Sequence, residues 1–232
     1  QDANSLQLKS AKLVEILEHL RSTFPRLQRV TTYARAKTIA RKEPDELEAI
    51  HAAGLDRLHV GLESGDDEIL KRIQKGVSAE EHIIAGKKAM NAGFQLSEYW
   101  MPGLGGKARW EQHARNTARV LNEINPHYAR SRPFFPYPGT PIYEEFHQGE
   151  FQYLSNEEQL RELKLMVENL NFSTKLCFDH DGNHWTDGKG HRLFKLDYEG
   201  YQFPEEKDTV LALIDSGLRA PSSSRNPLAR FL

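Results

Sequence analysis

The sequence predicts an α/β fold in which helices alternate with parallel strands, and the sheet is either open or closed into a barrel. Three observations support this prediction. Helical and strand-like patterns alternate four times along residues 10–135. The strand centres lie about thirty residues apart, which is the length of a βα unit. In addition, each predicted strand becomes polar where it ends.

Four strands are expected from runs of β-branched, aromatic and other apolar residues, at positions 27–34, 56–64, 94–101 and 127–135. Strands of a parallel sheet are buried on both faces and should read as continuously apolar. These four depart from that pattern at their carboxyl ends, where Tyr33, Glu63, Tyr99 and Arg132 stand. Because βα architectures bind ligands at this edge, we expect the active site there.

Four amphipathic helices are expected beside these strands. The first covers residues 10–24 and carries on one face Leu13, Ile16, Leu17 and Leu20. The second, residues 43–54, starts with a proline and stops at a glycine. The third, residues 78–93, opens with a capping box, and the fourth, residues 108–126, stops before a proline.

The character of the sequence changes after residue 148. A helix is expected over residues 155–170, followed by a segment rich in turn formers and histidine, a strand-like stretch at 191–198 and a last helix over 204–218. The end of the chain is rich in serine and proline, and we expect it to be disordered. We therefore divide the chain into a core, residues 1–148, a C-terminal extension, residues 149–220, and a flexible tail, residues 221–232.

Composition narrows the range of functions. Of the 232 residues, 38% are hydrophobic and 28% are charged, which is typical of the polar end of globular proteins. The formal net charge of −2 argues against general nucleic-acid binding, which requires a basic face. No apolar run is long enough for a membrane span. Because Cys177 is the only cysteine, no disulfide can form within the chain, and a cytoplasmic location is expected.

Four stretches in a fixed order resemble one enzyme family. They are "DANSL" (2–6), "GLDRLHVGLESGDDEILKRIQKG" (54–76), "GFQLSEYWMPGLGG" (93–106) and "RPFFPYPGTPIYE" (132–144). Together they resemble the radical S-adenosylmethionine (SAM) enzymes, in the branch of elongator-type and coproporphyrinogen-oxidase-like proteins. The resemblance covers residues 1–145, and it is weaker over 155–220, where it points to the C-terminal extension of one subgroup.

This resemblance implies a partial (β/α) barrel of TIM type with a C-terminal α+β extension. It also implies SAM and a [4Fe–4S] cluster as cofactors, the cluster being held by a Cys-x3-Cys-x2-Cys loop. The implied chemistry is reductive cleavage of SAM to a 5′-deoxyadenosyl radical that abstracts hydrogen from an unknown substrate. An electron donor such as flavodoxin or ferredoxin is the implied partner.

The sequence departs from the family pattern in its cysteines. It contains no Cys-x3-Cys-x2-Cys motif, and Cys177 lies far beyond the barrel motifs. The cluster loop, with the first βα unit, would lie upstream of Gln1. We therefore expect this chain to be an inactive fragment of a longer radical SAM enzyme. A naturally cluster-free relative is the alternative.

The resemblance implies which residues contact SAM. The amino group would meet the segment Asp2, Ala3 and Asn4, and the ribose would meet Tyr33. Glu63 and Ser64 would reach the ribose or the methionine portion. Each assignment has a simpler reading, because residues 2–4 suit a turn, Tyr33 suits the core and Ser64 suits a helix cap. Glu63 precedes the cap and is the hardest of these to explain structurally.

The remaining contacts lie on later strands. The resemblance pairs Lys75 with the SAM carboxylate, although a solvated lysine is nearly as plausible. Tyr99, Met101 and Gly103 would form the adenine site, where a glycine-rich turn allows close approach of a flat ring. Arg132 would flank the adenine and the substrate. It could bind an anionic group, or it could form a structural ion pair.

Two further hypotheses remain open from the residues alone. A cluster-free barrel could use Glu63 with Lys75 or Arg132 for acid–base chemistry, or it could serve only as a binding module. The extension also carries five possible metal ligands, Asp179, His180, Asp181, His184 and His191. Their spacing matches no strong zinc pattern and reads more simply as a turn, so no metal site is predicted in this chain.

Overall fold

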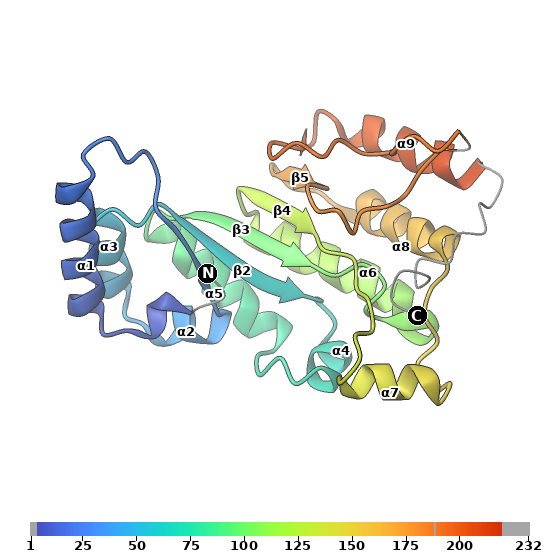
Figure 1. The fold of residues 1–232 in the computed structure, drawn as a ribbon, viewed down its shortest axis with the longest axis horizontal. Coiled ribbons are helices and arrows are strands. Elements are labelled where there is room, and N and C mark those ends of the chain that lie inside the picture. The colour runs from blue at the N-terminus through green and yellow to red at the C-terminus, as the bar shows by residue number, and fades with distance from the viewer. Residues whose placement is uncertain (1–3, 188, 220–232) are drawn as a thin grey trace.

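The computed structural model describes residues 4–187 and 189–219. Its six strands form one sheet in the order β1-β2-β3-β4-β5-β6, with β1 to β5 parallel and β6 antiparallel to β5. Helices cover one face of the sheet, as Figure 1 shows. The predicted α/β fold with parallel strands is confirmed. The predicted tail beyond residue 220 lies outside the described residues.

The strands are short, and their order in the sheet is the same as their order in the chain. Their bounds are β1 Thr31–Ala34, β2 Arg57–Glu63, β3 Gln95–Trp100, β4 Tyr128–Ser131, β5 Lys175–Cys177 and β6 Tyr201–Gln202. The first four lie inside the ranges expected from the sequence. The sheet continues across residue 148, because β5 pairs with β4 over Tyr128↔Lys175 to Arg130↔Cys177.

The helices alternate with the strands up to β4 and then cover the extension. Their bounds are η1 Ser5–Gln7, α1 Ser10–Thr23, α2 Ala36–Arg41, α3 Pro44–Ala52, α4 Asp67–Arg72, α5 Ala79–Asn91, α6 Gly106–Ile124, α7 Pro141–His147, α8 Asn156–Asn169 and α9 Lys207–Arg219. The short helices α2 and α7 were not expected. Figure 1 shows α4 and α7 near the arrowheads of the strands, where Arg72 pairs with Glu145.

Side-chain caps begin several of the helices. The Ser78 hydroxyl accepts the backbone N–H of Glu81, whose carboxylate accepts the N–H of Ser78, so the predicted capping box of α5 is confirmed. Ser155 and Glu158 form the same arrangement at α8. In α1, however, Ile16 is exposed while Leu13 and Leu17 are buried. The apolar face of this helix is therefore narrower than its pattern suggests.

The strand-like pattern at residues 191–198 is wrong as a strand prediction. Within this stretch the structure has only an isolated bridge, between Thr186 and Arg192. The Asp197 carboxylate accepts the backbone N–H groups of Glu199 and Gly200, which forms a turn in place of a ladder. The strand partner of β4 is instead β5, inside the segment that looked like turns, because an existing strand edge supplies its hydrogen bonds.

The two faces of the sheet differ in character. On the face that packs against helices, most alternate residues are apolar and fully buried, namely Leu58, Val60, Leu62, Leu96, Trp100, Ala129 and Leu176. Glu98 is a buried exception, and it lies 3.0 Å from His82 of α5. On the other face, which we call the inner face, the alternating residues are polar or aromatic. They include Tyr33, Arg57, His59, Ser97, Tyr99, Arg130 and Cys177. Because the inner face carries polar and aromatic side chains and the other face is mainly apolar, we expect a ligand to bind on the inner face.

In the described part of the chain, no helix is both long and apolar enough to span a membrane.

Candidate functional site

The backbone is irregular at the carboxyl end of β2. The register with β3 shifts between Gly61 and Glu63, and Glu63 adopts a left-handed conformation with φ of 62°. Its carbonyl accepts the backbone N–H of Met101 at 2.9 Å. A glutamate rarely adopts a positive φ, since its Cβ crowds the backbone. Such strain persists where the surroundings impose it, often at functional sites.

The Glu63 side chain turns back over the sheet. A Cβ built on Gly61 would overlap Glu63 Oε1 and would lie 3.0 Å from Lys75 Nζ. Because that Cβ would point along the inner face, as the side chains of alternate β2 residues do, the Glu63 carboxylate lies on the inner face. Lys75 Nζ donates to Glu63 Oε1 at 2.8 Å, and both side chains are 24% exposed. Glu63 and Lys75, both predicted as site residues, therefore form one partly exposed ion pair.

The loop after Glu63 is anchored to α6. Ser64 is fully buried, and its hydroxyl accepts the backbone N–H of Asp66. Gly65 donates its N–H to the Thr117 hydroxyl at 3.0 Å. The cap of α4 is Asp66, whose carboxylate accepts the N–H of Ile69, so Ser64 is not the cap. This anchoring holds Glu63 in place from its carboxyl side.

Asp66 also ties α4 to α6 through its ionised carboxylate. Arg109 donates to both Asp66 oxygens at 3.0 and 2.9 Å, and Asn116 donates to Oδ2 at 2.8 Å. Burial opposes ionisation of Asp66, but the hydrogen bonds from Arg109, Ile69 N–H and Asn116 outweigh it and hold the pKa of Asp66 below its usual value.

Three aromatic rings lie side by side across β1, β2 and β3. The ring centroids are 5.5 Å apart between Tyr33 and His59, 5.8 Å between His59 and Tyr99, and 6.2 Å between Tyr33 and Tyr99. The Tyr99 hydroxyl lies 2.9 Å from His59 Nδ1. The Arg132 guanidinium covers the Tyr99 ring at 4.6 Å. The structure thus brings together three predicted residues, Tyr33, Tyr99 and Arg132, around the unpredicted His59.

The charge state of His59 follows from its surroundings. Burial, and after it the nearby charges of Arg57, Arg130 and Arg132, lower the pKa of His59 to about 4. The imidazole is therefore neutral at pH 7 and can exchange a hydrogen bond with the Tyr99 hydroxyl. Burial also raises the pKa of Tyr99 well above its usual value, so that phenol stays protonated.

Stability should reveal the lowered pKa of His59. An unfolded histidine has a pKa of about 6.5, so below that pH the unfolded state binds a proton that the folded state excludes until about pH 4. Stability must therefore fall as the pH falls through this window. Between pH 7 and pH 5, we expect the unfolding free energy of the wild type to lose about 2 kcal/mol more than that of His59→Gln. Urea unfolding at the two pH values measures this.

The control for this measurement is His19→Gln, because His19 is exposed. It should follow the pH dependence of the wild type. An equal stability difference between the wild type and His59→Gln at both pH values would contradict the assignment.

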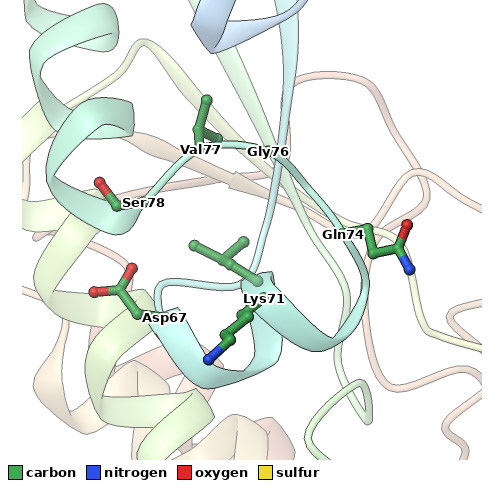
Figure 2. Close-up of a pocket in the computed structure, with 7 residues that line it drawn as sticks. Asp67, Lys71, Gln74, Gly76, Val77 and Ser78 are labelled. Atoms are coloured by element: carbon green, nitrogen blue, oxygen red, sulfur yellow. The ribbon is translucent and has the colours of Figure 1, made fainter.

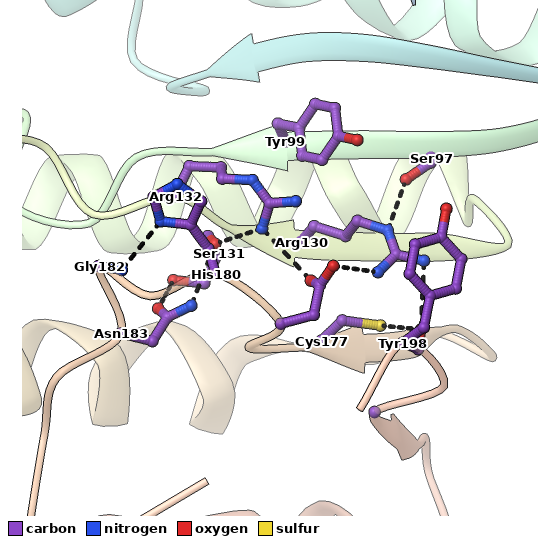
Figure 3. A network of polar contacts seen from close by, with 12 residues as sticks. Ser97, Tyr99, Arg130, Ser131, Arg132, Cys177, His180, Gly182, Asn183 and Tyr198 are labelled. Atoms are coloured by element: carbon purple, nitrogen blue, oxygen red, sulfur yellow. Dashed lines mark hydrogen bonds and ion pairs between the residues drawn. The ribbon is translucent and has the colours of Figure 1, made fainter. Parts of the chain in front are cut away.

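Arg130 and Arg132 point to the same side of β4, as the alternation of the strand predicts, and a carboxylate from the extension bridges them (Figure 3). Asp179 Oδ2 lies 2.9 Å from Arg130 Nη1, and Asp179 Oδ1 accepts from Arg132 Nη1 at 3.3 Å. Burial opposes ionisation of Asp179, but the charges of Arg132 and Arg130 outweigh it and lower the pKa of Asp179. Ser131 faces away, and its hydroxyl donates to Asn183 Oδ1.

Arg57 and Tyr198 extend this charged cluster along the inner face. Arg130 donates through Nε to the Ser97 hydroxyl and lies over the Tyr198 ring at 3.7 Å. Arg57 lies over the Tyr128 ring at 4.4 Å and donates through Nη1 to the Tyr198 hydroxyl. Both arginines are fully buried. Tyr198, like Asp179, belongs to the extension, so the extension builds part of the inner face.

The glycine-rich turn after β3 packs against the extension. Gly103 adopts φ of 87° and donates its N–H to Glu162 Oε2 at 2.7 Å. Gly106 adopts φ of 53°, and a Cβ there would lie 2.8 Å from the Phe151 ring. Met101 packs at the edge of an apolar cluster that includes Leu104 and Phe134. Packing within the chain thus accounts for these glycines, and the predicted adenine contact of Met101 and Gly103 stays a prediction.

The first predicted segment lies partly outside the described residues, since Asp2 and Ala3 are not among them. Asn4 lies at the carboxyl end of β1. Its Oδ1 accepts the backbone N–H of Arg35 at 3.2 Å, and its Nδ2 donates to Thr38 Oγ1 at 2.7 Å. These contacts match the simpler reading of Asn4 as a turn residue. A contact of Asn4 with SAM stays a prediction.

The only cysteine is not a metal ligand in this fold. Cys177 lies in β5, fully buried, and burial raises the pKa of its thiol to about 12. Among residues 4–187 and 189–219, no group of three histidine, cysteine or carboxylate side chains is placed to hold a metal ion. His184 Nε2 lies 2.9 Å from Asn156 Oδ1, and His191 Nδ1 lies 3.1 Å from Asp187.

A shallow pocket of about 380 Å³ lies beside the loop that carries Lys75 (Figure 2). It is lined by Asp67, Leu70, Lys71, Gln74, Gly76, Val77 and Ser78. Asp67 is already engaged, because its carboxylate accepts the backbone N–H of Ala79 at 2.7 Å. No buried unpaired group points into this pocket, within the described part of the chain. We therefore assign it no function.

Sequence reasoning missed two residues that the inner face depends on. His59 stands two and four residues before Gly61 and Glu63, and this two-residue period in "HVGLE" was the available signal. Asp179 was considered only as a metal ligand. Its pairing with Arg130 and Arg132 depends on β5 lying beside β4, and no local pattern indicates this.

The fold is a partial (β/α) barrel, an architecture in which ligands bind at the carboxyl ends of the parallel strands. A family model for the Radical SAM superfamily matches residues 4–115. This match confirms the resemblance to radical SAM enzymes that the sequence motifs predicted. Members of the superfamily use SAM and a [4Fe–4S] cluster.

Solved structures share the fold. The archaeal Methanocaldococcus infernus Elp3 superposes with a TM-score of 0.57 at 19% identity, over 83% of this chain and 43% of that chain. Coproporphyrinogen III oxidase (HemN) from Escherichia coli gives a TM-score of 0.54 at 16% identity, over 72% and 38%. Methylornithine synthase (PylB) gives 0.51 at 16% identity, over 93% and 54%. The predicted partial TIM-type barrel is thereby confirmed.

Two curated proteins match part of the chain. A "tRNA uridine(34) acetyltransferase" from Methanocaldococcus infernus is 27% identical over 117 residues, which is 50% of this chain and 22% of that protein. A "tRNA-2-methylthio-N(6)-dimethylallyladenosine synthase" from Ehrlichia chaffeensis is 30% identical over 89 residues, which is 38% of this chain and 20% of that protein. The matched part of this chain thus spans about a fifth of each curated relative.

Proposed function

We propose that this chain forms the SAM-binding wall of a radical SAM enzyme. In the complete enzyme, the superfamily's reductive cleavage of SAM would start hydrogen abstraction from a substrate. The observation that supports this most is Glu63, held at a positive φ with its carboxylate folded onto the inner face beside Lys75. Backbone strain of this kind is retained where a side chain must point to a ligand.

The geometry supports distinct roles for the two charged groups. The Glu63 carboxylate can accept hydrogen bonds from two vicinal hydroxyls or from an ammonium group, as SAM offers both. The Lys75 ammonium both holds that carboxylate and can face an anionic group. The exposed ring of Tyr33 offers an apolar face for a nucleoside. These residues would bind and orient the cofactor.

The residues of this chain do not fit the iron–sulfur cluster. Three thiolates would be needed, and the 232 residues contain one cysteine, which is buried in β5 as a thiol. We propose that the cluster ligands come from residues outside this sequence. An electron donor such as flavodoxin or ferredoxin, and a cytoplasmic location, belong to the same proposal.

The substrate does not follow from the curated relatives. The names of both concern tRNA, but each match leaves about four fifths of the relative uncovered. The formal net charge of −2 gives no independent support for nucleic-acid binding.

The proposal is tested by SAM affinity of the full-length gene product. Glu63→Gln should weaken SAM binding about tenfold or more, because a charged hydrogen-bond acceptor contributes about 1.5–3 kcal/mol. Gly61→Ala should weaken it as well, since the added methyl group displaces the Glu63 carboxylate without changing any charge. Isothermal titration calorimetry measures the affinity. Anaerobic reduction followed by an assay for 5′-deoxyadenosine measures the reaction.

The matched control is Glu123→Gln. Glu123 pairs with Lys87 at 2.9 Å, as Glu63 pairs with Lys75, but on the exposed surface. It should leave SAM affinity unchanged. Absence of SAM binding by the full-length wild type would reject the proposal. It would leave acid–base chemistry by Glu63 with Lys75 or Arg132, or a binding module, as the remaining functions.

A further inference from the structure

The inner face carries an excess of positive charge. Arg57, Arg130 and Arg132 lie on this face, and the Asp179 carboxylate bridges the last two. Glu199, whose carboxylate also interacts with Arg57 and Arg130, pairs with Lys175. The pair of Glu63 and Lys75 is neutral overall. A surface with this excess of positive charge favours an anion. Burial, and after it the charges of the same three arginines, lower the pKa of His59.

Two of the three arginines are buried too deeply to meet a ligand. Arg57 donates to Gln95 through Nε and Nη2, and to the Tyr198 hydroxyl through Nη1. Arg130 reaches Ser97, Asp179 and the carbonyl of Tyr198. Both side chains are fully buried and lie over tyrosine rings. They therefore shape the site, and only the third arginine can meet a ligand.

Arg132 is held in place yet keeps free donors. Its Nη1 donates to the carbonyl of Ser131 at 2.9 Å and to Asp179 Oδ1 at 3.3 Å, while its plane lies over Tyr99 (Figure 3). Its side chain is 25% exposed. Among the described residues, Nε and Nη2 have no hydrogen-bond partner. These two atoms form the guanidinium edge that binds two oxygens of a carboxylate or phosphate in parallel.

We propose that Arg132 binds an oxyanion of the substrate, a carboxylate or a phosphate ester, through its Nε–Nη2 edge. Asp179 is the positioning residue, because it occupies Nη1 and directs the free edge away from β5. The aromatic rings of Tyr99 and Tyr33 continue the site on the other side of the guanidinium. This inference rests on the proposed function, since it assigns Arg132 to the substrate and not to SAM.

The test follows the Nε–Hε resonance of Arg132 by NMR in the full-length protein labelled with ¹⁵N-arginine. Benzoate and phenyl phosphate are the probes, because each joins an oxyanion to a flat ring. Benzamide has the same ring without the charge. We expect at least one of the two anions to shift the Arg132 resonance, with or without saturating SAM. Whichever anion binds tighter identifies the source of the oxyanion.

Variants give the matched controls. Arg132→Gln assigns the resonance by removing it. For the variants, isothermal titration calorimetry measures anion affinity. Arg132→Gln should abolish anion binding, and Arg132→Lys should bind about tenfold more weakly because it lacks the paired donors. Arg161→Gln, on the exposed face of α8, should leave anion affinity unchanged.

Three outcomes would overturn the inference. They are no shift with either anion, an equal shift with benzamide, or a shift caused by SAM alone that then prevents anion binding. The last would make Arg132 a cofactor contact and would leave the proposed function intact. Conversely, an anion shift in a protein that fails to bind SAM would reject the proposed function while the oxyanion site stands.

Discussion

Gly65→Ala is expected to destabilise the protein by about 3 kcal/mol or more, because the added methyl group would collide with backbone atoms next to the loop after β2. A Cβ at Gly65 would overlap the carbonyl oxygen of Asn116, and would lie 2.5 Å from the Asn116 carbonyl carbon and 2.7 Å from Thr117 Cα. All three are backbone atoms of α6 and cannot rotate away. Urea unfolding followed by circular dichroism measures the loss.

Gly76→Ala separates this clash from simple backbone strain. Gly76 adopts φ of 78°, but a Cβ there would meet nothing within 4 Å. We expect it to cost about 1 kcal/mol, the usual effect of a side chain at a positive φ. If Gly65→Ala were no more destabilising than Gly76→Ala, the loop after β2 would not be held against α6 as described.

Asp179→Asn should have the second large effect, destabilising the fold by roughly 3 kcal/mol at neutral pH. The substitution keeps the shape of the side chain but leaves Arg130, which is fully buried, without its charged partner. Removing one member of a buried pair is costly because the other charge stays desolvated. Urea unfolding of the wild type and the variant at pH 7 measures the difference.

The pH dependence identifies charge as the cause. The folded pKa of Asp179 is lowered, so its contribution is complete above the unfolded pKa of about 3.9 and is lost as the pH falls through the folded value. The gap between wild type and Asp179→Asn should therefore close in strong acid. A gap that persists there would assign the effect to packing.

Asp181→Asn is the matched control for Asp179→Asn. It is the same substitution two residues away, on a side chain that is 95% exposed and 3.8 Å from Arg192. An exposed pair of this kind contributes little, so the change should stay within about 0.5 kcal/mol. If both variants lost a similar amount of unfolding free energy, the pairing of Asp179 with the two arginines would not explain the loss.

The candidate site joins residues that the chain supplies in two parts. Glu63, Tyr99 and Arg132 come from the carboxyl ends of strands in the predicted core, whereas Asp179 and Tyr198 come from the extension. Without Asp179, Arg130 would carry an uncompensated buried charge. The extension therefore does more than cover the barrel, since it sets the charge and orientation of the inner face.

The pattern of residues alone predicted the alternating fold, four of its strands and the polar carboxyl edge. These follow from periods of 2 and 3.6 residues and from local cap and turn chemistry, which act over a few neighbouring residues. For the same reason the sequence indicated Glu63, because a carboxylate that directly ends an apolar strand has no local structural explanation.

Tertiary structure alone decided which side chains meet. β5 became a strand because the edge of β4 accepts it, and residues 191–198 did not become one because Asp197 closes a turn there. His59 acquired its lowered pKa, and Arg132 its partner Asp179, from segments distant in sequence. Long-range electrostatics and hydrogen-bond pairing depend on distances between folded elements, and no local pattern of residues encodes those distances.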